Sequence, residues 1–152
     1  MSPVATLTGQ DVGEAEGALT GLLERILAGS NTGLKRTEYI TLRVLATRGP
    51  GASLADFREF LLRQPQLALD PTSVDELLNG LEVRGVITVG GPEAEGSVRL
   101  TAAGAALHAN AATAVQAVTA RLYAGLDPEQ LSIAHDVLVE LTRRASRLRA
   151  EG

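Results

Sequence analysis

The chain has 152 residues, of which 45% are hydrophobic and 21% charged, so it is long enough to bury one apolar core as a single domain spanning 1–152. It has no cysteine, which excludes disulfides, thiolate metal sites and a cysteine nucleophile and fits a cytoplasmic location. A formal net charge of -4 at pH 7 excludes a surface covered in nucleic-acid-binding groups and leaves only a local basic face for binding phosphate.

Two helices are expected at the start of the chain. Apolar residues recur at spacings of three and four over 11–28, which is the period of one helical face, and the turn-forming residues 29–33 end that helix. A second helix is expected over 35–47, and the glycines and proline of 49–51 end it.

Two further helices and a hairpin are expected next. A short helix begins at Ser53, and a longer one begins at Asp70, which is followed by a proline suited to the first helical position. The β-prone runs 86–89 and 97–100 then form a hairpin. This order predicts a mainly α fold with a winged helix-turn-helix lobe over 34–100 and a small β-hairpin wing.

The remaining residues are expected to form two long helices. One starts at Thr101, and the other follows Asp127 and Pro128, which have the form of an N-cap and a first-turn proline. The last helix has apolar residues at spacings of three and four for nearly three heptads, as coiled coils do. We therefore expect 11–29 and 101–150 to form a dimerisation domain that joins two copies of the chain. The alternative is that both apolar stripes pack on each other within one chain.

Three strings of residues occur in an informative order. They are Thr37-Glu38-Tyr39 leading to Val44-Leu45, Leu81-Glu82-Val83-Arg84-Gly85-Val86-Ile87, and Leu100-Thr101-Ala102-Ala103-Gly104. Over 11–149 the chain resembles the multiple antibiotic resistance regulator (MarR) family of winged-helix repressors. The resemblance implies a homodimer that inserts a recognition helix from each copy into the major groove of a near-palindromic operator in double-stranded DNA. It also implies a small aromatic or phenolic ligand between the dimer helices and the DNA-binding lobe.

The expected wing departs from the family pattern, which is an Asp-x-Arg-Arg type sequence whose arginine enters the minor groove. The tip here is Gly91-Pro92-Glu93-Ala94-Glu95-Gly96, and its two carboxylates repel phosphate. Arg99 is the only cation in the hairpin, so we expect the wing to add little DNA affinity.

The expected recognition helix is also acidic, which limits what it gains from the phosphate backbone. Its apolar stripe turns inward and leaves an outward face of Thr72, Ser73, Asp75, Glu76 and Asn79. On this face the amide of Asn79 matches adenine, and Glu76 can accept a hydrogen bond from cytosine. The alternative is a solvated acidic face without a partner.

Three cations that precede the recognition helix in the sequence are expected to contact DNA. Lys35 and Arg36 begin a helix, where positive charge opposes the helix dipole, so their placement indicates an anionic partner such as phosphate. The alternative is that the loss is small at an exposed helix end. Arg58, on the first helix of the helix-turn-helix pair, is the third cation of this group.

The resemblance implies a ligand site near Leu22, Ile26, Tyr39, Arg43 and His108. A guanidinium such as that of Arg43 suits an aromatic carboxylate, and the alternative is that it contacts solvent or forms an ion pair within the dimer.

We expect no metal, no cofactor, no membrane-spanning segment and no enzymatic activity. The two histidines, His108 and His135, lie on different expected helices and match no metal-ligand string, and no Ser, His and Asp group can be assembled into a triad. The sequence therefore predicts a dimeric DNA-binding transcriptional regulator, a repressor modulated by a small aromatic ligand. The alternative is a winged-helix dimer that binds a protein partner or has lost operator binding.

Overall fold

The computed structural model describes residues 5–48, 52–90 and 96–152. Two expected features, the end of the second helix at 49–51 and the acidic wing tip at 91–95, lie outside these residues. The chain divides into two compact units, Met1–Ala117 and Val118–Gly152.

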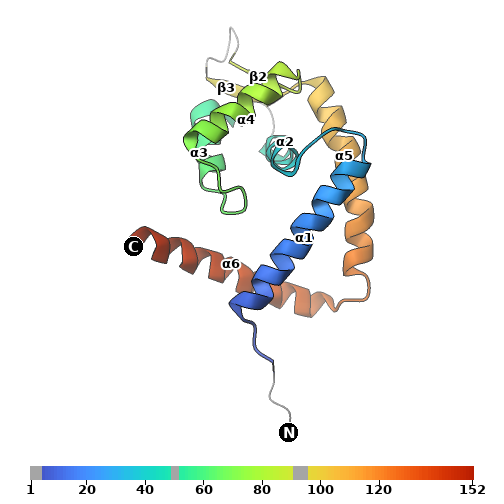
Figure 1. The fold of residues 1–152 in the computed structure, drawn as a ribbon, viewed down its shortest axis with the longest axis vertical. Coiled ribbons are helices and arrows are strands. Elements are labelled where there is room, and N and C mark those ends of the chain that lie inside the picture. The colour runs from blue at the N-terminus through green and yellow to red at the C-terminus, as the bar shows by residue number, and fades with distance from the viewer. Residues whose placement is uncertain (1–4, 49–51, 91–95) are drawn as a thin grey trace. The chain divides into compact units, whose positions relative to one another are not determined.

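In its described residues, the first unit contains five helices, the last of which runs on into the second unit, and three short strands in the order of a winged helix (Figure 1). The elements are α1 (Gly9–Gly29), α2 (Arg36–Arg48), β1 (Ala52–Ser53), α3 (Leu54–Leu62), α4 (Pro71–Val83), β2 (Ile87–Val89), β3 (Ser97–Leu100) and α5 (Ala102–Tyr123). This order confirms the mainly helical winged helix-turn-helix fold expected from the sequence.

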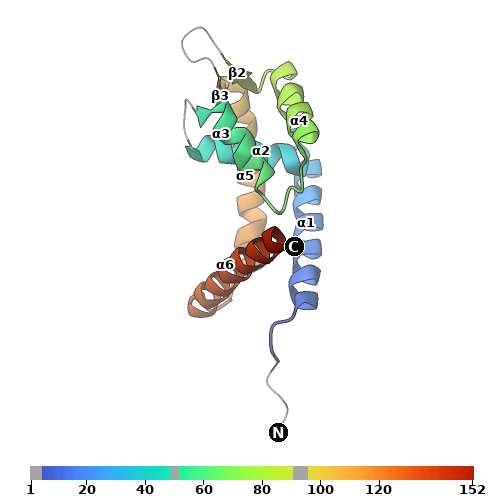
Figure 2. The ribbon, with the colours of Figure 1, turned by 90° about the vertical axis from the view of Figure 1, so that its left-hand side faces the viewer.

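The strands form one antiparallel sheet in the order β1-β3-β2. Ile87 pairs with Leu100 and Val89 with Val98 between β2 and β3, as expected for the hairpin. The two-residue strand β1 pairs with the other edge of β3, and the sequence did not predict it. Figures 1 and 2 show the sheet beside α3 and α4, with which it makes contacts.

The core of this unit fixes which face of α4 points outward. Phe57 and Leu61 of α3 are fully buried, as are Val74 and Leu81 of α4 and Leu42 of α2. Each such side chain contributes roughly 1.5–3 kcal/mol when it is taken out of water. The helix-turn-helix pair is therefore held by a shared apolar layer, and the opposite face of α4 stays at the surface.

Hydrogen bonds join the start of α5 to the two residues directly before β2. Thr101 donates its backbone N–H to the carbonyl of Val86 at 3.1 Å and its hydroxyl to the carbonyl of Gly85 at 2.7 Å. The hydroxyl oxygen also accepts the N–H of Gly104 at 3.0 Å. A Cβ on Gly104 would lie 2.9 Å from the carbonyl carbon of Val86, which is closer than such atoms approach, so only glycine lets α5 pack here.

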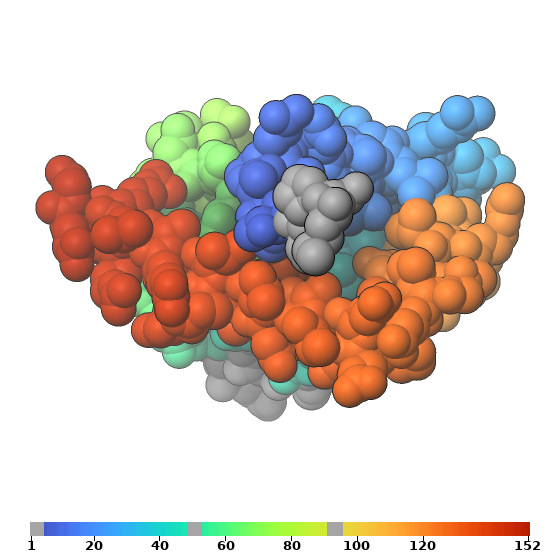
Figure 3. All heavy atoms as spheres, turned by 90° about the horizontal axis from the view of Figure 1, so that it is seen from below, coloured from blue at the N-terminus to red at the C-terminus, as the bar shows by residue number. Residues whose placement is uncertain are grey.

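The second unit contains the end of α5 and the helix α6 (Pro128–Glu151). Asp127 is the N-cap of α6, as predicted, and its carboxylate accepts the N–H of Glu129 at 3.0 Å. All of α6 is described, and none of its residues is buried. Figure 3 draws the atoms of this helix in the colours at the red end of the bar. Hydrogen bonds from Arg143 and Arg144 lower the pKa of Glu140 to about 2. Among the described residues, no helix has the length and apolar content needed to cross a membrane.

Candidate functional site

Helix α4 begins as the sequence predicts. The carboxylate of Asp70 accepts the backbone N–H of Ser73 at 2.7 Å, and Pro71 occupies the first turn. The Ser73 N–H lowers the pKa of Asp70, because it stabilises the ionised form. This cap fixes where the helix starts and hence which residues lie on its outward face.

The outward face of α4 has free hydrogen-bonding groups. Thr72, Glu76 and Asn79 are exposed, and Ser73 is half-buried, as expected for residues opposite the apolar stripe. Within the described residues, the side chains of Glu76 and Asn79 make no hydrogen bond to the protein. These groups are available to the edges of bases in a DNA groove.

Most of the negative charge along α4 has partners within the protein. Asp75 forms an ion pair with Arg58 of α3, with 2.9 Å between Oδ1 and Nη2. Glu82 accepts the backbone N–H of Val89 at 3.3 Å. Among the described residues, Glu76 is therefore the one acid of α4 without a protein partner, and the helix presents less uncompensated negative charge than its composition indicates.

The four predicted DNA-binding cations divide into two pairs. Arg36 is held between α1 and the segment before α4, 3.8 Å from the carboxylate of Glu24 and donating to the carbonyl of Gln66 at 3.1 Å. Arg58 is paired with Asp75. Lys35 and Arg99 are exposed, and their side chains have no partner in the described part of the chain. The structure thus leaves two of the four cations free for phosphate.

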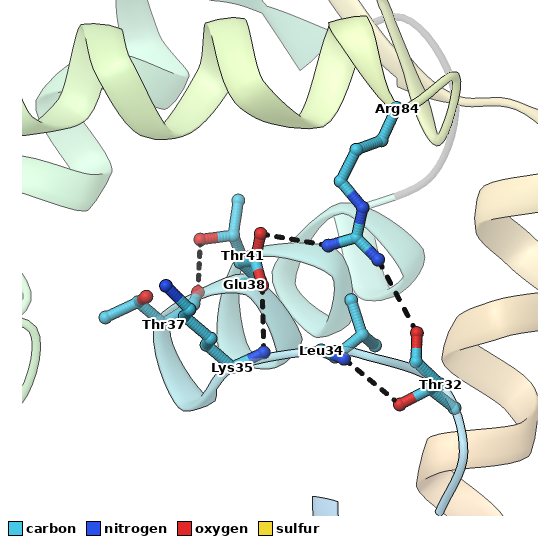
Figure 4. Close-up of polar contacts among 7 residues, drawn as sticks. All are labelled: Thr32, Leu34, Lys35, Thr37, Glu38, Thr41 and Arg84. Carbon is cyan, nitrogen blue, oxygen red and sulfur yellow. Dashed lines mark hydrogen bonds and ion pairs between the residues drawn. The ribbon is translucent and has the colours of Figure 1, made fainter. Parts of the chain in front are cut away.

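Arg84, directly after α4, joins that helix to the start of α2 (Figure 4). Its Nη1 lies 3.0 Å from Oε2 of Glu38, and its Nη2 is 3.5 Å from the carbonyl oxygen of Thr32. Glu38 also accepts the backbone N–H of Lys35 at 2.8 Å, which caps α2. Both residues lie in strings that carry the family resemblance, but the sequence did not predict that they pair. The pair fixes the end of α4 against α2.

Three of the predicted ligand residues lie together. The rings of Tyr39 and His108 stack with their centroids 5.7 Å apart and their planes 22° from parallel. Burial lowers the pKa of His108, and the positive charge of Arg43 lowers it further. The Nε2 atom of His108 is buried without a hydrogen-bond partner in the described residues. This cluster combines an aromatic face, a cation and a free imidazole nitrogen.

The other two predicted ligand residues, Leu22 and Ile26, are half-buried on α1. Their part in a ligand site stays a prediction.

A surface pocket between α2 and α3 was not predicted. It has a volume of about 290 Å³ and is lined by Arg48, Asp56, Glu59, Phe60 and Arg63. The guanidinium of Arg48 lies 4.3 Å from the centre of the Phe60 ring. The lining of the pocket has two basic and two acidic side chains, so its charges balance. The described residues contain no group of His, Asp or Glu arranged to hold a metal.

Comparisons with known proteins support the fold. No family model matches the chain, and no curated protein matches it in sequence. A MarR-family protein of Mycobacterium tuberculosis, solved in complex with DNA, is 26% identical with a TM-score of 0.62, over 90% of this chain and 98% of that one. The same protein solved with salicylic acid gives 26% identity and a TM-score of 0.61, over 90% and 97% of the two chains. CouR of Rhodococcus jostii RHA1, solved with p-coumaroyl-CoA, is 21% identical with a TM-score of 0.68, over 86% and 88%. The chain has the winged-helix fold of these regulators.

Proposed function

We propose that this chain is a cytoplasmic transcriptional regulator that binds a near-palindromic DNA operator as a homodimer and acts as a repressor. The observation that carries the proposal is the outward face of α4. Its apolar side is fixed in the core, and the exposed side chains of Thr72, Glu76 and Asn79 have the donors and acceptors needed to recognise bases.

Affinity and specificity come from different residues. Lys35 and Arg99 are exposed cations that can contact phosphate, which positions the lobe without selecting a sequence. Asn79 can bond adenine through two atoms, and Glu76 can accept from the amino group of cytosine. The solved complex of a similar MarR-family protein with DNA supports DNA as the partner.

A homodimer is supported by the apolar residues that the second unit exposes. Ile133, Val137, Leu138, Leu141 and Leu148 of α6 are each exposed to solvent in the single chain. A contiguous apolar stripe of this kind is typical of a helix that packs on a partner. Sedimentation equilibrium at micromolar concentration is expected to give the mass of two chains, and the mass of one chain would contradict the dimer.

A small aromatic acid is proposed as the modulating ligand, held near Tyr39, Arg43 and His108. The ring stack offers an aromatic surface, and Arg43 can pair with a carboxylate. The structure of a similar MarR-family protein with salicylic acid supports this class of ligand. CouR was solved with p-coumaroyl-CoA, which also contains an aromatic ring but whose carboxyl group is joined to coenzyme A. Calorimetric titration with salicylate is expected to give heat that Arg43→Gln reduces, and no heat with the wild-type protein would contradict the proposal.

The experiment that tests DNA binding is a fluorescence-anisotropy titration with the DNA upstream of the protein's own gene, at low and at physiological salt. We expect binding that resists competitor DNA and weakens as salt rises, because phosphate contacts release counterions. The variant Asn79→Ala should lose affinity for this DNA, whereas Glu59→Gln, at a largely exposed position on α3, should not. No binding at low salt would contradict the proposal.

The second candidate is a winged-helix dimer that binds a protein partner in place of DNA. Two ion pairs favour this candidate, Arg36 with Glu24 and Arg58 with Asp75. They leave fewer unpaired cations to contact phosphate. Failure to bind DNA at low salt, together with a dimer in solution, is the outcome that selects this candidate.

A further inference from the structure

The ion pair between Arg58 and Asp75 lies where the helix-turn-helix pair would meet DNA. Arg58 comes from α3 and Asp75 from the outward face of α4, and their side chains are 37% and 62% exposed. Asp75 is next to Glu76 and one turn before Asn79 on this face. A phosphate that approaches the pair therefore meets the guanidinium and the carboxylate together.

The carboxylate satisfies Arg58 only in part. Oδ1 of Asp75 lies 2.9 Å from Nη2 of Arg58 as an ion pair, while the Nε of Arg58 is buried with no partner in the described residues. A guanidinium has five donors in a planar fork and binds phosphate or carboxylate best through two of them at once. An exposed ion pair of this kind also adds little to stability, because water and salt screen it. The pair can therefore open at small cost when another anion takes the place of Asp75.

The other acids near α4 cannot have the same effect. Asp70 is used as the helix cap, and Glu82 accepts a backbone N–H from the sheet. Glu76 has no cation beside it within the described residues. Asp75 is thus the acid of this surface that faces an arginine expected to contact DNA.

We propose that Asp75 holds Arg58 in place of a DNA phosphate, so that DNA must compete with it, and that Asp75 in this way lowers affinity for DNA of any sequence. This inference rests on the proposed DNA-binding function. It makes Asp75 a residue that sets the sequence-independent part of the affinity: Asp75 weakens a phosphate contact that every sequence offers, and contacts to bases, such as those proposed for Asn79, decide between sequences.

The test is Asp75→Asn, titrated against an unrelated DNA duplex and against the upstream DNA over a series of salt concentrations. Affinity for the unrelated duplex should rise about threefold to tenfold at low salt, and the slope of log K against log salt should steepen by about 0.9, the value for one further phosphate neutralised. The ratio of the affinities for the two duplexes should change little, because both duplexes offer Arg58 the same phosphate contact.

Glu59→Gln is the charge-matched control. Glu59 pairs with Arg63 on the same α3 helix, and both side chains are largely exposed, so the variant makes the same change in net charge and also frees an arginine. It should leave both the affinity and the salt slope close to those of wild type. Equal effects of Glu59→Gln and Asp75→Asn would overturn the proposal, because net charge would then explain them.

A variant that already lacks the Arg58 guanidinium distinguishes competition between Asp75 and phosphate from a purely structural role of the ion pair. In Arg58→Gln, the further change Asp75→Asn should bring no gain, because no guanidinium is left to release. A gain of the same size there, or a loss of affinity in Asp75→Asn alone, overturns the proposal while leaving DNA binding intact. Absence of binding by wild type and by every variant at low salt overturns the proposed function itself.

Discussion

The ion pair between Glu38 and Arg84 is expected to stabilise the junction of α2 and α4. The distance between the two groups and their exposure set the free energy that is lost when the pair is removed. The two groups are 3.0 Å apart, and their side chains are 16% and 37% exposed. An exposed pair is worth about 0.2–1 kcal/mol, and a hydrogen bond to a charged group about 1.5–3 kcal/mol. Since Arg84 is more than a third exposed, a coupling free energy of about 1 kcal/mol is expected.

Glu38→Gln is the perturbation that removes the charge and keeps the size. Glu38 also accepts the N–H of Lys35 at 2.8 Å, so the variant weakens the cap of α2 as well as the ion pair. We expect the free energy of unfolding to fall by about 1–2 kcal/mol, which corresponds to a melting temperature lower by about 2–4 °C for each kcal/mol.

A double-mutant cycle in urea measures the coupling directly. It uses Glu38→Gln, Arg84→Gln and the double variant, with Glu59→Gln and Arg63→Gln as a matched cycle on an exposed pair within α3. The first cycle should give about 1 kcal/mol and the second less than about 0.5 kcal/mol. Additive effects in the first cycle would refute the reasoning, because the two side chains would then not stabilise each other.

Two further predictions concern stability. Gly104→Ala should destabilise the protein by about 1–3 kcal/mol, because the added Cβ meets the backbone of Val86. Gly13→Ala, in open space on α1, should stabilise it by up to about 1 kcal/mol. Melting temperatures that change in the same direction in both variants would contradict this. His108 has a lowered pKa in the folded chain, so the unfolded chain takes up protons first, and stability should be full above about pH 6.5 and fall as the pH drops below it. Urea midpoints between pH 5 and about 8 should show this slope, and His108→Asn should flatten it; an unchanged slope would count against His108 as the source.

Local signals in the sequence predicted the elements well. The Asp70-Pro71 pair places the start of α4, and Asp127 with Pro128 places the start of α6, because a cap and a first-turn proline act on their own helix. The inward stripe of α4 followed from its period, and Val74 lies in the core as expected. These features can be predicted without knowing which residues pack against the helix from other parts of the chain.

Features that depend on two distant segments were not predicted. Gly104 belongs to one of the strings that carry the resemblance, but its packing role was not predicted, because that role is set by the close approach of Val86. The pairing of Arg58 with Asp75 depends on the packing of two helices, so a count of charges overestimated both the acidity of α4 and the freedom of Arg58. Strand β1 has two residues and pairs only because the fold brings it to the edge of β3.

The central claim is that α4 recognises a DNA sequence, and the ratio of affinities for two duplexes tests it most directly. The upstream DNA and a scrambled duplex of equal length and composition would be titrated with the wild-type protein at physiological salt. We predict that the upstream DNA binds at least about 10³-fold more tightly, as specific regulators do. A ratio near one would contradict the claim, even if both duplexes bind.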